Sequence, residues 1–188
     1  SSYTYGIYKL KSLQHLLNLD YFEMSYSDLW PSSIDKINST ISYTMNSNPN
    51  QNINQVKKRC TLATMAEQQV AYHMCGQVID SKVDYNDPFS FAFDVLSSHI
   101  YHGARIEVKT HQSDGRWINV NIDRKNESGF MNLYPLLNYS VADFITIFRT
   151  DKIKQGTYAF TSMFTGTPHQ IVPLIKKSQY NQYYYLDI

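Results

Sequence analysis

Hydrophobic and polar positions alternate in residues 105–110, and this period of two predicts a β-strand. Successive side chains of a strand point to opposite faces, so Ile106 and Val108 are expected to face a core. By the same rule Glu107 and Lys109 lie together on the other face. The strand therefore presents a carboxylate and an ammonium group side by side.

A second alternating segment, residues 89–96, precedes this strand and predicts another one. Asp94 is expected on the face opposite to its apolar residues, because neighbouring positions alternate. Residues 97–104 contain a glycine and are expected to turn the chain, so that the two strands pair and Asp94 comes close to Glu107. The apolar residues expected to share a face are Phe91, Phe93 and Val95.

A helical period of hydrophobic positions spans residues 55–75, and Gly76 follows at a position where a positive φ is typical. Glu67 lies in the middle of this helix, among small apolar residues at helical spacing. Burial of a lone carboxylate is unfavourable unless it is paired or near a metal ion. Two interpretations stay open: Glu67 belongs to a functional site, or it lies at the border of the apolar stripe and pairs with a Lys or Arg.

The rest of the chain supplies further elements of both kinds, which together predict an α/β protein with a mixed sheet flanked by helices. Residues 1–55 are expected to form a helical extension, with helices near residues 10–17 and from Pro31 to Met45, before a polar loop. We expect one domain over residues 1–188, with a core at 56–165 and a tail at 166–188. The other predicted elements are strands at 117–122, 142–149 and 158–164 and a short helix at 131–138.

Composition narrows the class of protein. The chain has 188 residues, of which 43% are hydrophobic and 18% are charged, which is typical of a globular domain. No hydrophobic run is long enough to span a membrane, so we expect a cytoplasmic protein. Cys60 and Cys75 fall on the same predicted helix, roughly 22 Å apart along its axis. They are therefore expected to be free, buried thiols in a reducing compartment.

The charged side chains on the paired strands suit one kind of chemistry. The carboxylates of Asp94 and Glu107 are hard oxygen ligands of the type that Mg²⁺ takes, together with waters and phosphate oxygens. The side chain of Lys109 can orient or deprotonate a metal-bound water, or stabilise charge that develops on the phosphorus. This combination predicts a metal-dependent phosphodiesterase.

The spacing of Asp94 from Glu107-Val108-Lys109 resembles the PD-(D/E)XK, or restriction-endonuclease-like, superfamily of nucleases, although no proline precedes Asp94. The resemblance implies an αβββαβ core. It also implies that Asp94, Glu107 and the carbonyl of Val108 hold Mg²⁺, for which Mn²⁺ substitutes, and that Lys109 serves the attacking water. Glu67 matches an acidic helix residue found in many of these nucleases, and members often act as homodimers.

Nucleic-acid binding has to depend on local groups, because the formal net charge of the chain is only +1. The expected function is a metal-dependent endodeoxyribonuclease whose partner is DNA, in the host cytoplasm if a phage encodes it. Two alternatives stay open: a catalytically silent module that binds nucleic acid or protein, and an endoribonuclease. The candidate contacts to nucleic acid are Lys57, Lys58, Arg59, Arg105, His111 and Arg116.

Overall fold

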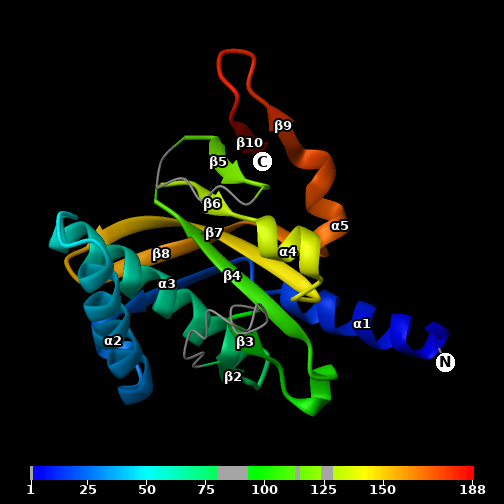
Figure 1. Ribbon diagram of the computed structural model, residues 1–188. Helices are drawn as coiled ribbons and strands as arrows, with labels where there is room; N and C mark the ends of the chain where they lie inside the picture. The colour runs from blue at the N-terminus through cyan, green and yellow to red at the C-terminus, as the bar shows by residue number, and fades with distance from the viewer. Residues whose placement is uncertain (1, 80–92, 113–114, 124–128) are drawn as a thin grey trace.

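The computed structural model describes residues 2–79, 93–112, 115–123 and 129–188. Within these residues the chain forms a six-stranded sheet in the order β1-β8-β7-β4-β3-β2 and a four-stranded sheet in the order β6-β5-β10-β9 (Figure 1). The strands of the large sheet are Tyr21–Ser25 (β1), Gln77–Val78 (β2), Val95–Leu96 (β3), Arg105–His111 (β4), Phe144–Lys154 (β7) and Thr157–Gly166 (β8). Those of the small sheet are Trp117–Asn121 (β5), Met131–Asn132 (β6), Ile175–Lys177 (β9) and Tyr184–Asp187 (β10).

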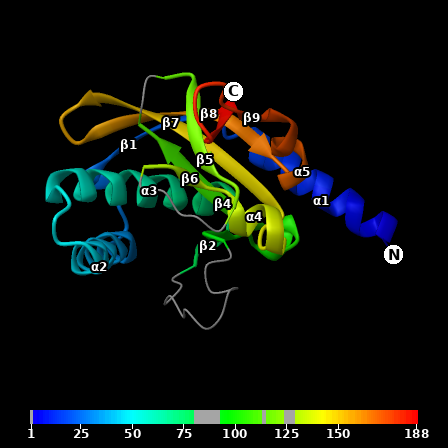
Figure 2. The same ribbon diagram turned by 45° about the horizontal axis from the view of Figure 1, so that its top comes forward.

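The helices lie on both sides of the large sheet, as the mixed α/β prediction required (Figures 1 and 2). None of those in the described ranges is long and apolar enough to cross a membrane. The α-helices are Ser2–Leu17 (α1), Pro31–Ser47 (α2), Ile53–His73 (α3), Tyr134–Tyr139 (α4) and Pro168–Ile171 (α5). Single 3₁₀ turns occupy Tyr26–Asp28, His99–Tyr101 and Val172–Leu174.

Strand β4 lies inside the large sheet and has neighbours of opposite direction. It pairs antiparallel with β3 and parallel with β7. Its predicted alternation is confirmed, since Ile106 and Val108 are buried while Glu107 and Lys109 are partly exposed. The large sheet therefore buries one face of β4 and leaves the face that carries Glu107 and Lys109 partly exposed.

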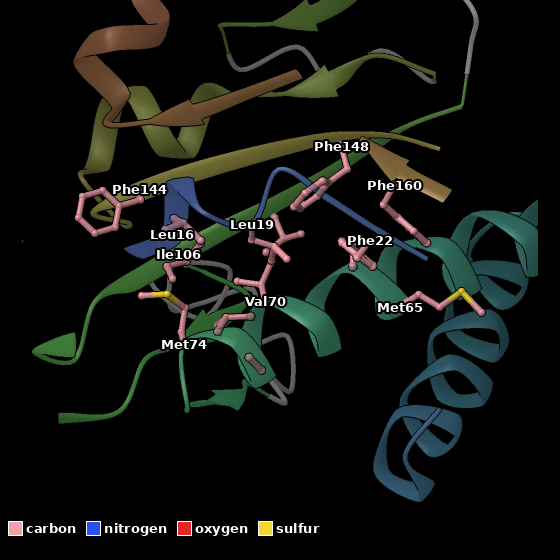
Figure 3. Close-up of a cluster of buried hydrophobic side chains, with 14 of the residues drawn as sticks. Leu16, Leu19, Phe22, Met65, Val70, Met74, Ile106, Phe144, Phe148 and Phe160 are labelled. Carbon is pink, nitrogen blue, oxygen red and sulfur yellow. The ribbon is translucent and has the colours of Figure 1, made fainter. Parts of the chain in front are cut away.

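Two hydrophobic cores cover the two faces of the large sheet. The first lies between the sheet and helices α1 and α3, and Figure 3 shows part of it. The second lies between the large sheet and the small sheet with α4 and α5. Residues labelled in Figure 3 include Leu16 of α1, Met65 and Val70 of α3, and Ile106, Phe148 and Phe160 of the strands.

Both ends of the chain are more integral to the sheets than predicted. Residues 1–55 contain β1, which pairs with β8, and Phe22 of this strand enters the first core. The end of the chain supplies β9 and β10, and Leu186 is completely buried in the second core. The expected helical extension thus contains α1 and α2 but also a strand, and the expected tail contains two strands. These short strands complete sheets whose other strands lie far away in sequence.

The central strands and helix agree with the predictions apart from their boundaries. The strands expected at 142–149 and 158–164 are confirmed as β7 and β8, and both extend further than predicted. The strand expected at 117–122 is β5, but it belongs to the small sheet. The region expected as one short helix at 131–138 contains both β6 and α4.

The strand expected at 89–96 is only partly tested, because residues 80–92, including Phe91, lie outside the described residues. The described part is β3, and the chain bends at Asp94 just before it. Phe93 packs in the second core whereas Val95 is buried in the first. The expectation that these two side chains share a face was therefore wrong, since the bend interrupts the alternation.

Helix α3 begins and ends two residues earlier than predicted. The side chain of Asn52 accepts hydrogen bonds from the backbone N–H groups of Asn54 and Gln55 and caps the first turn. At the other end the positive φ of 49° falls on Cys75, which is exposed, rather than on Gly76. The predicted free thiols are confirmed, but only Cys60 is buried.

Gly76 is needed for a close contact between backbones. A Cβ atom at this position would lie 2.0 Å from the carbonyl oxygen of Leu96 and 2.7 Å from the Cα of Ser97. Glycine at this point therefore lets the chain after α3 approach the end of β3.

The start of β4 is held against the start of β7 by Arg105 and Asp143. The Asp143 carboxylate accepts hydrogen bonds from the Arg105 backbone N–H at 2.9 Å, from its Nε at 3.3 Å and from its Nη2 at 3.2 Å. The Asp143 backbone N–H donates in return to the Arg105 carbonyl at 2.8 Å. Burial alone would raise the pKa of Asp143, but the Arg105 hydrogen bonds and charge outweigh burial and hold this pKa below its ordinary value.

We predict that Gly76→Ala destabilises the protein by about 1–3 kcal/mol, because the added methyl group would have to displace backbone atoms. Gly6→Ala is the matched control. Its added methyl group meets no atom within 4 Å, and alanine favours the helix. Urea denaturation followed by circular dichroism measures both changes, and equal stability of Gly76→Ala and the wild type would contradict the close contact.

We predict that Asp143→Asn lowers the free energy of unfolding at pH 6 by about 1.5–3 kcal/mol, since charge-assisted hydrogen bonds are lost. Because the pKa of Asp143 in the folded protein lies below the ordinary value of 3.8, its contribution to stability is complete above that pH and is lost as the pH falls through the folded pKa. The difference between variant and wild type should therefore shrink at pH 3.

Asp151→Asn serves as the control for this pH series. Asp151 forms a half-exposed pair with Arg149 at 3.2 Å, and such pairs contribute little. Urea unfolding at pH 6 and pH 3 measures each variant. A loss of stability in Asp143→Asn that is the same at both pH values would show that its charge is not the cause.

Candidate active site

The site lies at the start of β3, where the backbone hydrogen bonds between β3 and β4 end. The Asp94 backbone N–H donates to the Ile106 carbonyl at 3.0 Å, and the next bond along β4 involves a side chain instead. The Val108 backbone N–H donates to Oδ2 of Asp94 at 2.8 Å. In a strand the N–H and C=O of one residue point to the same side, so the Val108 carbonyl also faces the Asp94 side of β4.

Glu107 and Lys109 stand next to each other on the charged face of β4, as the alternation predicted. Their Oε1 and Nζ atoms are 3.1 Å apart, and both side chains are mostly buried. In the parallel register they lie opposite Ile145 and Ile147, which belong to the second core. Glu107 and Lys109 thus lie between the second hydrophobic core and the site.

Glu67 reaches the same place from α3. Its side chain is 10% exposed and forms hydrogen bonds to Asp94 and to Lys36, whose Nζ lies 2.6 Å from Oε2. Both interpretations of Glu67 left open by the sequence therefore hold together, because it pairs with a lysine and also joins the carboxylates. We call Glu67, Asp94 and Glu107 the acidic cluster.

The acidic cluster and Lys109 line one cleft with a volume of about 770 Å³. Helix α3 forms one wall, β4 forms the base, and β5 with the segment leading into β6 forms the other wall. Figure 2 shows α3 and these strands beside β4. The lining residues used below are Arg59, Glu67, Asp94, Glu107, Val108, Lys109, His111, Trp117, Asn119, Phe130 and Asn132.

The electrostatics of the cleft reflect three buried carboxylates in close proximity. Burial, followed by the charge of Asp94, raises the pKa of Glu67 to about 8 and that of Glu107 to about 8. Burial alone would lower the pKa of Lys109, but Glu107, Asp94 and Glu67 outweigh burial and raise it. The raised pKa values of the two glutamates show that the carboxylates repel one another, and a cation bound in the cleft would relieve this repulsion.

The cleft offers carboxylate and carbonyl oxygens as ligands for a divalent metal ion. Among the residues described, no three His, Cys, Asp or Glu side chains are arranged to hold one ion. The described part of the chain would therefore give a metal in the cleft at most two carboxylate ligands, with carbonyl, water or phosphate oxygens completing its shell. Mg²⁺ is commonly bound in this way, so the donor set fits it.

The predicted nucleic-acid contacts are dispersed. Arg59 and His111 line the cleft, whereas Lys57 and Lys58 are exposed on α3 outside it. Burial lowers the pKa of His111, which favours its neutral form.

Two of the predicted contacts are held by acids away from the cleft lining. Arg105 is bound by Asp143 at the start of β4. Arg116 pairs with Asp187 at 2.6 Å, next to the first residue of β5.

Several residues of the site were missed in the sequence. Lys36 lies on α2, and its charge gave no indication that it contacts Glu67, because that contact depends on how two helices pack. Trp117 and Asn119 alternate with buried residues on β5, and this alternation could have identified them as one exposed face. Phe130 joins the same wall through a connection that has no pattern of its own.

Comparison with known proteins adds two findings. The sequence profile of the family described as bacteriophage T4 endonuclease IV matches residues 7–188. The chain is also similar to Endonuclease IV of Enterobacteria phage T4, with 40% identity over 175 residues that cover 92% of this chain and 95% of the relative. Both matches include every residue of the acidic cluster.

Proposed function

Because the chain belongs to the bacteriophage T4 endonuclease IV family, we propose that it is a metal-dependent endodeoxyribonuclease that hydrolyses phosphodiester bonds of DNA. The observation that carries the proposal is the convergence of Asp94, Glu107 and Lys109 in one cleft. Two carboxylates can hold a divalent metal ion, and an ammonium group beside them can stabilise the charge that develops on a phosphate during hydrolysis.

We further propose that the core is of the restriction-endonuclease-like PD-(D/E)XK type. Apart from β5 and β6, which come between β4 and α4 and belong to the small sheet, the order is α3, β2, β3, β4, α4 and β7. This helix, three strands, helix and strand support the assignment. The antiparallel pairing of β2, β3 and β4 and the parallel pairing of β4 with β7 support it further. In this arrangement Asp94 lies immediately before β3 and Glu107 lies on β4, the next strand.

The residues proposed to hold Mg²⁺, or Mn²⁺ in its place, are Asp94, Glu107 and the carbonyl of Val108. Support comes from the hydrogen bond between the Val108 N–H and Asp94, which places the Val108 backbone against that carboxylate. The ion would supply positive charge to offset the charge that develops on the phosphate.

Lys109 is proposed to align the attacking water and to stabilise charge on the phosphate. The neighbouring carboxylates raise its pKa, so Lys109 keeps its proton and acts as a hydrogen-bond donor rather than as a base. In the proposed reaction a P–O bond forms to the water oxygen and the P–O3′ bond breaks. The products are a 5′-phosphate and a 3′-hydroxyl.

The DNA strand is proposed to lie in the cleft, between Arg59 on α3 and the wall formed by Trp117 and Asn119. A cleft of this size admits a nucleotide strand and not only a small ion. The proposed place of action is the host cytoplasm of a phage, and a homodimer stays a prediction.

We predict that the purified protein nicks plasmid DNA with Mg²⁺ or Mn²⁺ and that EDTA abolishes the activity. Lys109→Ala should lower the rate by about 10²-fold or more, since it removes charge stabilisation at the phosphate. Lys154→Ala, at an exposed position of β7, is the control and should keep full activity. Full activity in EDTA, or in Lys109→Ala, would refute the assigned roles, and cleavage of RNA alone would change the substrate class.

We predict that DNA binding changes the fluorescence of Trp117, because this side chain lines the cleft and is 62% exposed. The chain has two tryptophans, so Trp30→Phe leaves Trp117 as the only reporter and Trp117→Phe leaves Trp30. Titration with an oligonucleotide in EDTA should change the emission of the first variant and leave that of the second unchanged. The opposite result would place the DNA outside the cleft.

A further inference from the structure

The two lysines of the site neutralise different carboxylates. Lys109 lies 3.1 Å from Glu107 on the same strand, whereas Lys36 lies 2.6 Å from Glu67 and comes from a different helix. Asp94 is held by the Val108 backbone N–H and by its hydrogen bond to Glu67. Glu67 is thus the member of the acidic cluster that contacts a cation from α2.

The position of Lys36 is set by a network of hydrogen bonds next to Glu67. Gln68 accepts from the Trp30 backbone N–H at 3.0 Å and from the Ser33 hydroxyl at 2.7 Å, and donates to the Asp28 carbonyl at 2.9 Å. Ser33 and Lys36 are three residues apart and therefore lie on one face of α2. The same packing that buries Gln68 brings the Lys36 ammonium to Glu67.

We infer that Lys36 takes the place of a second metal ion, so that the cleft binds a single divalent cation between Asp94 and Glu107. This inference rests on the proposed metal-dependent function. The ammonium of Lys36 neutralises Glu67 in the way that a second cation would, and it repels any further ion from that carboxylate. Glu67 then stays paired with Lys36 beside Asp94 and is not itself a metal ligand.

The charges of the cleft favour one ion over two. With all three carboxylates ionised around a bound metal ion, the acidic cluster with Lys36 and Lys109 has one net negative charge, and a single divalent ion turns this into one positive charge that can attract a phosphate. A second divalent ion would add two further positive charges in a largely buried space. Removal of the Lys36 charge would instead expose Glu67 as a ligand for a second ion.

Counting Mn²⁺ ions tests the inference without any measurement of cleavage. Isothermal titration calorimetry and electron paramagnetic resonance should give one Mn²⁺ per wild-type chain. Lys36→Met should bind two, because Glu67 becomes available, whereas Lys36→Arg keeps the charge and should bind one. Two ions in the wild type, or one in folded Lys36→Met, would overturn the role of Lys36.

A double variant covers the case in which Lys36→Met does not fold with an unpaired Glu67. Lys36→Met combined with Glu67→Gln removes both charges of this ion pair and should bind one Mn²⁺ with the affinity of the wild type. A tenfold or larger loss of affinity would show that Glu67 is a metal ligand and overturn the inference. A wild type that binds no Mn²⁺ would overturn the metal-dependent function as well. This result differs from those that overturn only the role of Lys36, so the two proposals can fail separately.

Discussion

One hydrogen bond, from the Val108 backbone N–H to the Asp94 carboxylate, joins the fold to the site. It continues the line of bonds between β3 and β4 with a side chain in place of a backbone carbonyl. The acid is thereby fixed to the strand that carries Glu107 and Lys109, and the Val108 carbonyl faces the same side. Helix α3 on one side and β5 on the other form the walls of a cleft above this part of β4.

Electrostatic repulsion explains why elements outside the central strands matter. Three carboxylates within a mostly buried space are unfavourable without cations. Lys109 comes from the same strand as Glu107, but Lys36 comes from α2 and depends on the contacts of Gln68. The N-terminal part of the chain is therefore tied to the site by charge, and by β1 to the large sheet.

The sequence predicted what depends on local periodicity, and it missed what depends on long-range packing. The period of two in β4 identified Glu107 and Lys109 correctly, and the position of Glu67 in an apolar stripe identified a buried acid. The alternation failed at Phe93, because the bend at Asp94 has no local pattern. Lys36 and β1 were missed for a related reason: their partners lie on elements far away in sequence.

Anomalous diffraction from a crystal soaked in Mn²⁺ tests the central claim most directly, because it locates the ion independently of any activity. The account predicts an anomalous peak within bonding distance of the carboxylates of Asp94 and Glu107, with Lys109 beside it. A peak at another place, or an acidic cluster without a peak at saturating Mn²⁺, would contradict it.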